Sequence, residues 1–272
     1  MLKRVLTLAG LSLFFTATHS CTKNEIAAEL GVPEHVKNQV AALGFRTDDV
    51  VKADGGYVVE GDIFLAEEDL NATIVDIQSL IVANTEQYRT TNLITNLPRN
   101  ITVFLKTSGS NALPSSYIAA LDEAINRYNS EGLLVTFTRV NSASAGAIDI
   151  TKAPNNAGYL ASAGFPTSNG NPYSSIRVNS NYLGNNPGTN YLATILAHEI
   201  GHCIGFRHTD YMDRSYSCGG SYYNEGQAGV GAIHIPGTPT GPDANSWMLA
   251  CIGAGQNRPF NSNDKIALNY LY

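Results

Sequence analysis

The stretch from His198 to His208 constrains the fold more than any other part of this 272-residue chain. It reads HEIGHCIGFRH, with three histidines, a glutamate and a glycine at fixed spacing. Residues four apart share one face of a helix, so the rings of His198 and His202 can point at one metal ion. Gly205 can take a positive φ that ends the helix. The chain can then turn back and present His208 as a third nitrogen ligand.

Three protein ligands leave one position of a tetrahedral zinc ion open, which is the pattern of a catalytic site. Glu199 follows His198 directly, where its carboxylate can meet a metal-bound water and act as a general base. Residues 191–204 are otherwise nearly all apolar, so we expect a buried helix. The alternative is a set of core histidines bonded to backbone carbonyls. That reading explains neither Glu199 nor the pairing of Gly205 with His208.

The extended motif resembles that of the metzincin zinc endopeptidases. The wording AHEIGHCIGFRHTD is similar to the bacterial dual-action HEIGH metallopeptidase family. The resemblance implies an α+β fold with a metzincin-like catalytic domain. Such a domain has a twisted, mostly parallel sheet with the active-site helix behind it, a zinc cleft and an irregular C-terminal subdomain. It also implies Zn²⁺ as the cofactor, held by His198, His202 and His208.

Metzincins carry a methionine in a tight turn beneath the metal, and the resemblance assigns this role to Met248. Met1 is the initiator, and Met212 lies too close to His208 to form a separate turn. Some metzincins have a tyrosine metal ligand two residues after the methionine. This chain has Ala250 there, so a tyrosine ligand is not expected.

The N-terminus predicts export from the cell. An apolar run over residues 5–15 follows Lys3 and Arg4, which is typical of a signal peptide over residues 1–20 and too short to span a membrane. Cys21 follows a small residue, as in a bacterial lipoprotein cleavage site; ordinary cleavage nearby is the alternative. We therefore expect a protein that is secreted or lipid-anchored at the bacterial cell envelope. Cys21 would be its only membrane attachment.

Charge and cysteine content narrow the remaining classes. The net charge of -6, without a cluster of basic residues, disfavours nucleic-acid binding. Besides Cys21, the chain has Cys203, Cys218 and Cys251, and export favours one disulfide among them. A pairing of Cys218 with Cys251 and a pairing of Cys203 with Cys251 both remain open. Cys203 lies one helical position from His202, about 100° round the helix, which disfavours a nucleophilic role.

The chain divides into a predicted propeptide over residues 21–84 and a peptidase domain over residues 85–272. Within the propeptide, the patterns predict short helices over 24–30 and 33–43, a strand over 57–65 and a helix from 67 to about 82. The polar residues 84–96 are predicted to form an exposed linker, with Arg89 as one site for activating cleavage.

The peptidase domain shows a β-α-β-β-β-α order. The predicted strands are 101–105, 133–140, 147–151 and 175–179, the predicted helices are 115–129 and 264–270, and residues 154–172 form a long loop. By its resemblance to the metzincins, the strand at 176–178 is expected to be the sheet edge along which a peptide substrate lies. Residues 209–242 are expected to form an irregular wall of the substrate pocket.

A latency device is suggested by Val59-Glu60-Gly61-Asp62-Ile63. This segment resembles the F-x-G-D-I element of the astacin-type metzincins, in which the aspartate occupies the open position of the metal. The resemblance implies that Asp62 caps the zinc in a zymogen. The alternative, an ordinary carboxylate at a turn, stays open. A prosegment thiolate is excluded because no cysteine lies between Cys21 and Cys203.

Together these features predict a secreted, zinc-dependent endopeptidase that is made as a latent zymogen. It would hydrolyse peptide or protein substrates through a metal-bound water, with Glu199 as the general base. One alternative is an exported binding or adhesion protein with a relic metal site, although a relic is expected to lose the base first. A second alternative is a processing protease of narrow specificity.

Overall fold

The computed structural model describes residues 31–71, 87–227, 229–238 and 242–272, and residues 32–272 form one compact unit. The predicted signal peptide, Cys21, the predicted helix over 24–30 and the boundary at residue 84 lie outside the described residues. So does most of the predicted helix from residue 67. None of the helices described is both long and apolar enough to pass through a bilayer.

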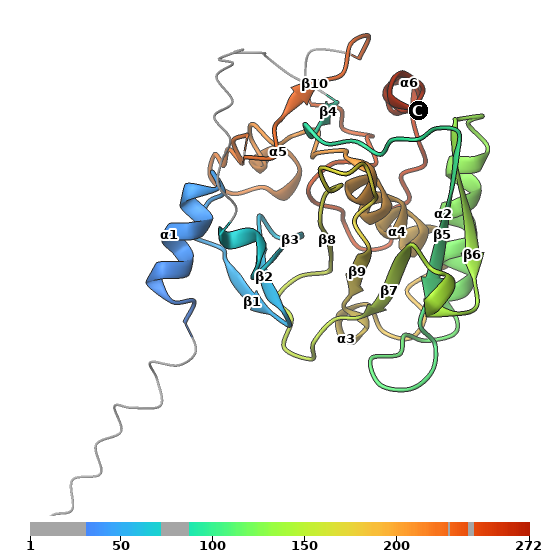
Figure 1. Ribbon diagram of the computed structural model, residues 1–272, viewed down its shortest axis with the longest axis horizontal. Helices are drawn as coiled ribbons and strands as arrows, with labels where there is room; N and C mark the ends of the chain where they lie inside the picture. The colour runs from blue at the N-terminus through green and yellow to red at the C-terminus, as the bar shows by residue number, and fades with distance from the viewer. Residues whose placement is uncertain (1–30, 72–86, 228, 239–241) are drawn as a thin grey trace, which may run out of the picture. The chain divides into compact units, whose positions relative to one another are not determined.

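An eight-stranded sheet forms the framework, in the order β1-β2-β3-β8-β9-β7-β5-β6 (Figure 1). Its strands are β1 (Val51–Ala53), β2 (Gly56–Val59), β3 (Ile63–Ala66), β5 (Arg99–Leu105), β6 (Val135–Val140), β7 (Ile148–Lys152), β8 (Ala161–Ala163) and β9 (Ser175–Val178). β6, β5, β7 and β9 pair in parallel, β8 is antiparallel to β9, and β3 is parallel to β8. The predicted mixed fold with a mostly parallel sheet is confirmed.

Helices cover this sheet and carry the site. They are α1 (Glu34–Ala42), α2 (Tyr117–Asn129), α3 (Ser180–Leu183), α4 (Thr189–Ile204), α5 (Ser215–Cys218) and α6 (Ser262–Leu271). In Figure 1, α2 runs beside β5 and β6, and α4 lies behind the middle of the sheet. A separate two-stranded ribbon pairs β4 (Tyr88–Arg89) with β10 (Ile233–His234).

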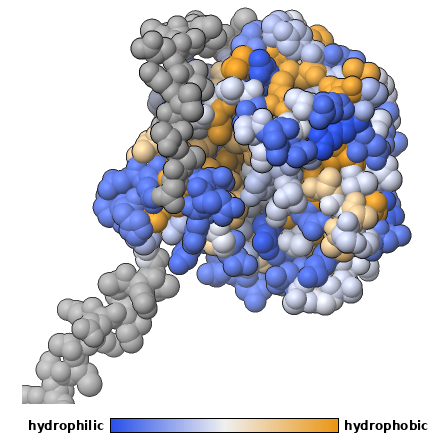
Figure 2. All heavy atoms as spheres, viewed as in Figure 1, coloured by the Kyte–Doolittle hydropathy of each residue, from blue (hydrophilic) through white to orange (hydrophobic). Residues whose placement is uncertain are grey.

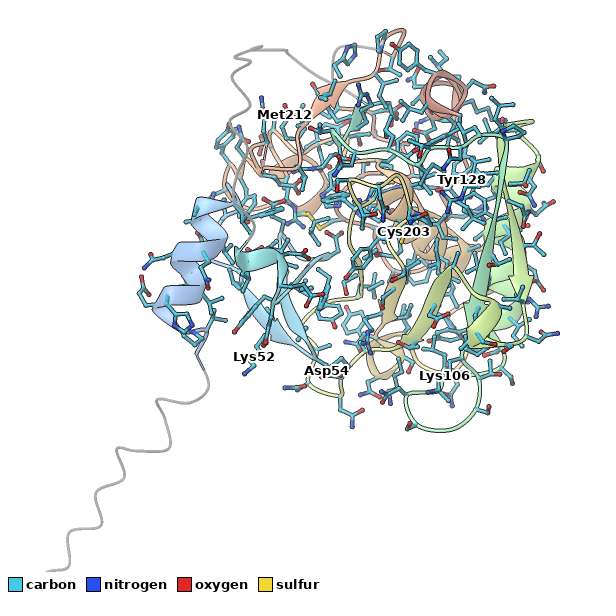
Figure 3. All side chains as sticks on the ribbon, in the orientation of Figure 1. Lys52, Asp54, Lys106, Tyr128, Cys203 and Met212 are labelled. Atoms are coloured by element: carbon cyan, nitrogen blue, oxygen red, sulfur yellow. A yellow bond between two sulfur atoms is a disulfide. The ribbon has the colours of Figure 1, made fainter. Side chains whose placement is uncertain are left out.

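The main core lies between the sheet and the pair α2 and α4. Alternate residues of β5, namely Ile101, Val103 and Leu105, are buried, as expected for a strand with one face on a core. In Figure 3, Tyr128 of α2 and Cys203 of α4 lie inside the molecule. Both side chains are fully buried. This packing fixes α4, the helix with the metal-site motif, on both sides.

A second, smaller core lies under α1 and β1–β3, where Val36, Val40, Val59 and Leu65 pack together. Figure 2 shows that the outward side of α1 is mainly hydrophilic, so its two valines are the inward face of an amphipathic helix. Residues of the predicted propeptide therefore extend the sheet of the peptidase domain and have a core of their own.

Three expectations about the sheet were wrong. The single strand over 57–65 is two strands, because Glu60 (φ 52°) and Gly61 (φ 85°) reverse the chain. The loop over 154–172 contains β8, which is too short to show an alternating pattern. Because β8 lies outside β9, the strand at 176–178 is internal and cannot receive a peptide at its edge.

The prediction of an exposed linker over 84–96 is also wrong for the residues of this stretch that the structure describes. Gln87, Tyr88 and Thr90 are buried, and Arg89 is half-buried in β4. The backbone of this segment pairs with β10, and the amide of Arg207 donates to the Tyr88 carbonyl at 2.9 Å. Cleavage at Arg89 is therefore disfavoured, because a protease needs an exposed segment.

Candidate metal centre

Helix α4 positions the first two histidines and the glutamate. His198, Glu199 and His202 are all buried on its C-terminal half. The helix ends at Gly205, whose φ of 111° lies in the left-handed region, as the motif predicts. A Cβ there would lie 2.7 Å from Cδ2 of Leu93, so glycine is required both by backbone conformation and by space. The turn brings His208 back beside the helix.

Each histidine is oriented by a second partner at its Nδ1. Nδ1 of His198 lies 2.8 Å from the Trp247 carbonyl, and Nδ1 of His202 lies 2.8 Å from the Phe206 carbonyl. Nδ1 of His208 lies 2.7 Å from Oε1 of Glu225. Carbonyl and carboxylate oxygens only accept hydrogen bonds, so each Nδ1 carries the proton and donates it. With Nδ1 of each ring engaged in this way, Nε2 is the atom by which each histidine can bind a metal ion.

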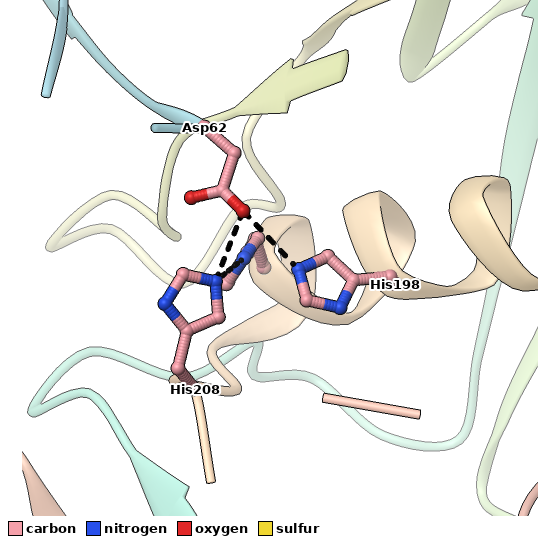
Figure 4. A group of neighbouring side chains, drawn as sticks. Asp62, His198 and His208 are labelled. Atoms are coloured by element: carbon pink, nitrogen blue, oxygen red, sulfur yellow. Dashed lines mark hydrogen bonds and ion pairs between the residues drawn. The ribbon is translucent and has the colours of Figure 1, made fainter. Parts of the chain in front are cut away.

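These Nε2 atoms converge on one point, together with a carboxylate oxygen from the predicted propeptide. Ligand atoms of His198, His202, His208 and Asp62 all lie within 4.8 Å of one another. Oδ2 of Asp62 is 3.0 Å from Nε2 of His208 and 3.5 Å from Nε2 of His198. Figure 4 shows Asp62 pointing from the strands toward the rings of His198 and His208.

This group fits a zinc ion. Nε2 of His202 and Nε2 of His208 lie 3.2 Å apart, and when both rings are neutral with the proton on Nδ1 neither can donate to the other. Two facing lone pairs at this distance repel, and a cation between them removes the repulsion. Nε2 of His198 is buried without a hydrogen-bond partner in the described part of the chain. Three imidazoles and one carboxylate form an N₃O donor set of the kind that zinc binds.

Glu199 lies next to the point where these ligand atoms converge but is not one of the ligands. It is buried, and its Oε2 has no hydrogen-bond partner among the described residues. Burial, followed by the charge of the nearby Asp62 carboxylate, raises the pKa of Glu199 well above its usual range. A carboxyl group in this state is suited to take up and hold a proton beside the metal position.

Met248 lies beneath α4, as the resemblance implies. It is fully buried, and a Cβ on Gly201 would come within 2.7 Å of its sulfur atom. The backbone of α4 therefore touches the methionine directly. The amide of Thr209 donates to the Met248 carbonyl at 2.9 Å, which ties the turn to the residue after the third histidine. Met212 lies elsewhere, near α5 and β10 (Figure 3).

A network of charges around His208 was not predicted. Glu225 accepts from His208 and also lies 3.3 Å from Nη2 of Arg207 and 3.2 Å from Nε of Arg214. Arg207 also contacts Glu60 of the propeptide segment at 3.5 Å. The side chains of Glu225, Glu60 and Arg207 are buried, so each charge requires a partner. No spacing in the sequence links Glu225 to the histidine motif.

The loop after His208 is tied to the methionine turn in two ways. Oδ1 of Asp210 accepts from the Ala250 amide at 2.9 Å. Cys218 and Cys251 form a disulfide, whereas Cys203 is a buried free thiol. This is one of the two pairings that the sequence left open. Both ties hold the wall beside the metal position in place.

A cavity of about 490 Å³ opens beside the metal position and is lined by His198 and Glu199. Its other walls come from residues 157–161, from the N-terminal turns of α4 and from residues 247–258. The metal position therefore has direct access to a space large enough to hold a substrate side chain. This is the arrangement expected of an enzyme cleft.

Comparison with known proteins agrees with this geometry. The model of the dual-action HEIGH metallo-peptidase family matches residues 57–272, which is more than half of the chain. None of the curated proteins compared with the chain matches it. A solved structure described as that of myroilysin aligns with a TM-score of 0.41 and 15% identity. The alignment covers 66% of this chain and 96% of that one.

Proposed function

The chain belongs to the dual-action HEIGH metallopeptidase family and is a zinc metallopeptidase; we propose that it is an exported endopeptidase made as a latent precursor. The observation that carries this proposal is the convergence of three histidine Nε2 atoms beside a buried glutamate whose Oε2 has no hydrogen-bond partner among the described residues. A zinc site that only stabilises a fold keeps four permanent protein ligands and needs no neighbouring base. Here the fourth group, Asp62, belongs to the predicted propeptide, so its removal would leave an open position.

Zinc would be held by His198, His202 and His208, and when bound it polarises the scissile carbonyl and lowers the pKa of water toward 7. Glu199 takes the proton of the attacking water on its free Oε2 and later passes it to the leaving amine. The partners of the three Nδ1 atoms hold the rings in place during these transfers. Met248 supports α4 from below and takes no part in proton transfer.

The substrate is proposed to lie along β8. In the peptidase domain β8 is the outermost strand on this side of the sheet, and here the propeptide strand β3 pairs with it. The amide of Ala163 donates to the Asp62 carbonyl at 3.0 Å. Once β3 is removed, these backbone groups are free to pair with an extended peptide, as in other cases of strand addition.

Latency is proposed to come from Asp62. Its Oδ2 occupies the side of the histidine group that faces the sheet edge, which is where a substrate carbonyl must arrive. Glu60 reinforces this placement, because its backbone carbonyl accepts from Arg214 and its carboxylate contacts Arg207. While residues 60–62 stay in place, they block both the metal position and the adjacent strand edge.

The proposal of export is based on the predicted signal peptide over residues 1–20. The proposal of a lipid on Cys21 is likewise based on the sequence. Both lie outside the described residues. Mass spectrometry and N-terminal sequencing of the released protein would report leader removal, lipidation and the propeptide cleavage site together. A mature N-terminus before residue 63 would contradict removal of the Asp62 segment.

The test of the peptidase proposal uses casein with the processed protein. We expect cleavage that a zinc chelator abolishes and added zinc restores. Glu199→Gln should keep the zinc, measured by elemental analysis, and lose activity by about 10²- to 10⁴-fold, the usual contribution of a general base. A processed wild-type protein that binds zinc and leaves casein and peptide mixtures intact would contradict a general endopeptidase.

The test of latency uses the uncleaved precursor. Asp62→Ala should make the uncleaved precursor active on a small peptide, because the blocking carboxylate is gone. Asp54→Ala is the matched control, since Asp54 is an exposed carboxylate of the same segment in the turn between β1 and β2. If the Asp62→Ala precursor were as inactive as wild type, while both gave active enzyme after processing, Asp62 would not be the blocking group.

A further inference from the structure

The cavity beside Glu199 has an unusual charge pattern, which bears on substrate choice and rests on the proposed function. Its walls are largely apolar and include Ile195, Trp247 and Leu249. Apart from the metal-site residues Asp62, His198 and Glu199, the charged residues that line it are Arg214 and Arg258. Beyond the catalytic group itself, this pocket therefore presents only positive charge.

The two arginines differ in how their charge is balanced. Arg214 is paired with Glu225 at 3.2 Å, a contact within the peptidase domain, and with Asp49 of the predicted propeptide at 3.9 Å only while that segment is present. Arg258 has no carboxylate partner among the residues that the structure describes. Its Nη1 donates to the Cys251 carbonyl at 2.8 Å, and its Nη2 donates to Oε1 of Gln256 at 3.2 Å. A guanidinium has five N–H donors, so donors remain for another acceptor.

The surroundings keep Arg258 beside the cavity. Its backbone amide donates to Oγ1 of Thr194 at 3.0 Å, one helical turn before His198 on α4. Its side chain is half-buried, and burial lowers the pKa of its guanidinium, with the charge of Asp210 acting in the opposite direction. Asp210 is already engaged with Ser217 and the Ala250 amide. A half-buried cation without a carboxylate partner favours an anionic ligand.

The register of β8 indicates which substrate residue reaches the cavity. Ala163 lies beside Asp62, the residue whose side chain reaches the metal position, because its amide donates to the Asp62 carbonyl, whereas Tyr159, Leu160 and Ala161 line the cavity. A peptide in antiparallel pairing with β8, the more stable arrangement, runs from Ala163 toward Tyr159 in its own N-to-C direction. The residue that directly follows the scissile bond therefore enters the cavity.

We propose that this cavity selects an acidic side chain, glutamate or aspartate, directly after the scissile bond, and that Arg258 is the residue that determines this preference. The apolar walls hold the methylene groups of the side chain, and the guanidinium pairs with its carboxylate. A charge-assisted pair of this kind is short and directional. The cavity is larger than a glutamate side chain, so water can fill the remainder.

The experiment uses a casein site that the processed enzyme cleaves, copied into three peptides that differ only after the cut bond. That position holds Glu, Gln or Leu, and mass spectrometry confirms the site of cleavage. We expect kcat/KM for the Glu peptide to exceed that for the Gln and Leu peptides about tenfold, or about 1.4 kcal/mol. Equal values, or a preference for Leu, would overturn the proposal.

Variants assign the preference to one side chain. The Arg258→Gln variant should lose the preference for the Glu peptide over the Gln peptide. It should still cleave the Leu peptide, and this cleavage shows that the variant is folded. Arg258→Lys should keep part of the preference, because it keeps the charge. Arg139→Gln is the control: it removes a positive charge outside the cavity and should change nothing. A Glu preference that persists in Arg258→Gln would overturn the assignment. Failure of wild type to cleave casein would instead contradict the proposed function.

Discussion

Glu225→Gln is the most informative perturbation of the zinc site, because it changes one buried atom and leaves every zinc ligand in place. The carboxylate accepts from Nδ1 of His208 at 2.7 Å and pairs with Arg207 and Arg214. A glutamine has nearly the same shape. It keeps one acceptor for His208, loses the charge and brings an NH₂ group toward the two arginines.

The expected magnitude follows from these contacts. Loss of a partner that orients a metal-binding histidine usually weakens metal affinity by about 10- to 100-fold, which equals about 1.4 to 2.7 kcal/mol. Removing one partner of a buried ion pair destabilises the fold by about 3 to 5 kcal/mol. In the precursor Arg207 also has Glu60 at 3.5 Å. The processed protein has lost that partner, so it should be destabilised more than the precursor.

Zinc affinity can be measured by competition with a chelating dye, and stability by urea unfolding of precursor and processed protein. Asp122→Asn is the matched control, an acid-to-amide change in the exposed pair with Arg139, where at most about 1 kcal/mol is expected. Wild-type zinc affinity in Glu225→Gln would refute the orienting role. An equal loss of stability in precursor and processed protein would refute the compensation by Glu60.

Two further predictions concern the support of the site. Gly201→Ala should lower both the melting temperature and zinc affinity, because its Cβ would meet the sulfur of Met248 at 2.7 Å; unchanged values would show that the turn can move away. The pKa of Asp264 is raised from 3.8 to about 7, mainly by burial. The folded state thus binds this proton more tightly than the unfolded state, so stability is lost as pH rises from about 4 through about 7. Asp264→Asn should remove this loss in unfolding experiments at about pH 5 and about pH 8, and an unchanged pH dependence would contradict it.

The features that could be predicted from the sequence are those fixed by short spacings. The position of His198, His202 and Glu199 on one helix follows from a four-residue period, and the helix end follows from Gly205. Burial of α4 follows from its continuous apolar run. The long strands and helix α2 follow from their periodicity. In each case the local pattern and the final packing favour the same structure.

The features that were missed depend on contacts between distant residues. β8 has three residues and no alternating pattern, so only its pairing with β9 and β3 reveals it. Glu225 lies 17 positions after His208, across a stretch whose only helix is the four-residue α5, and such a stretch carries no periodic signal. The reversal at Glu60 and Gly61 had a local signal, the glycine, but the apolar residues on both sides favoured one long strand.

If the protein is made as the proposed precursor, the same contacts would allow its activation without rebuilding the site. Strand β3 of the predicted propeptide pairs with β8 at one position, Ile63 opposite Ala163. Backbone pairing therefore contributes little to holding this segment in place. Side-chain contacts contribute more to holding it: Asp62 contacts the histidine group, and Glu60 contacts Arg207. The groups that orient the three histidines, by contrast, all lie after residue 205, in the peptidase domain. Under the proposed latency, departure of residues 60–63 would remove the block and leave the rings and Glu199 in their positions.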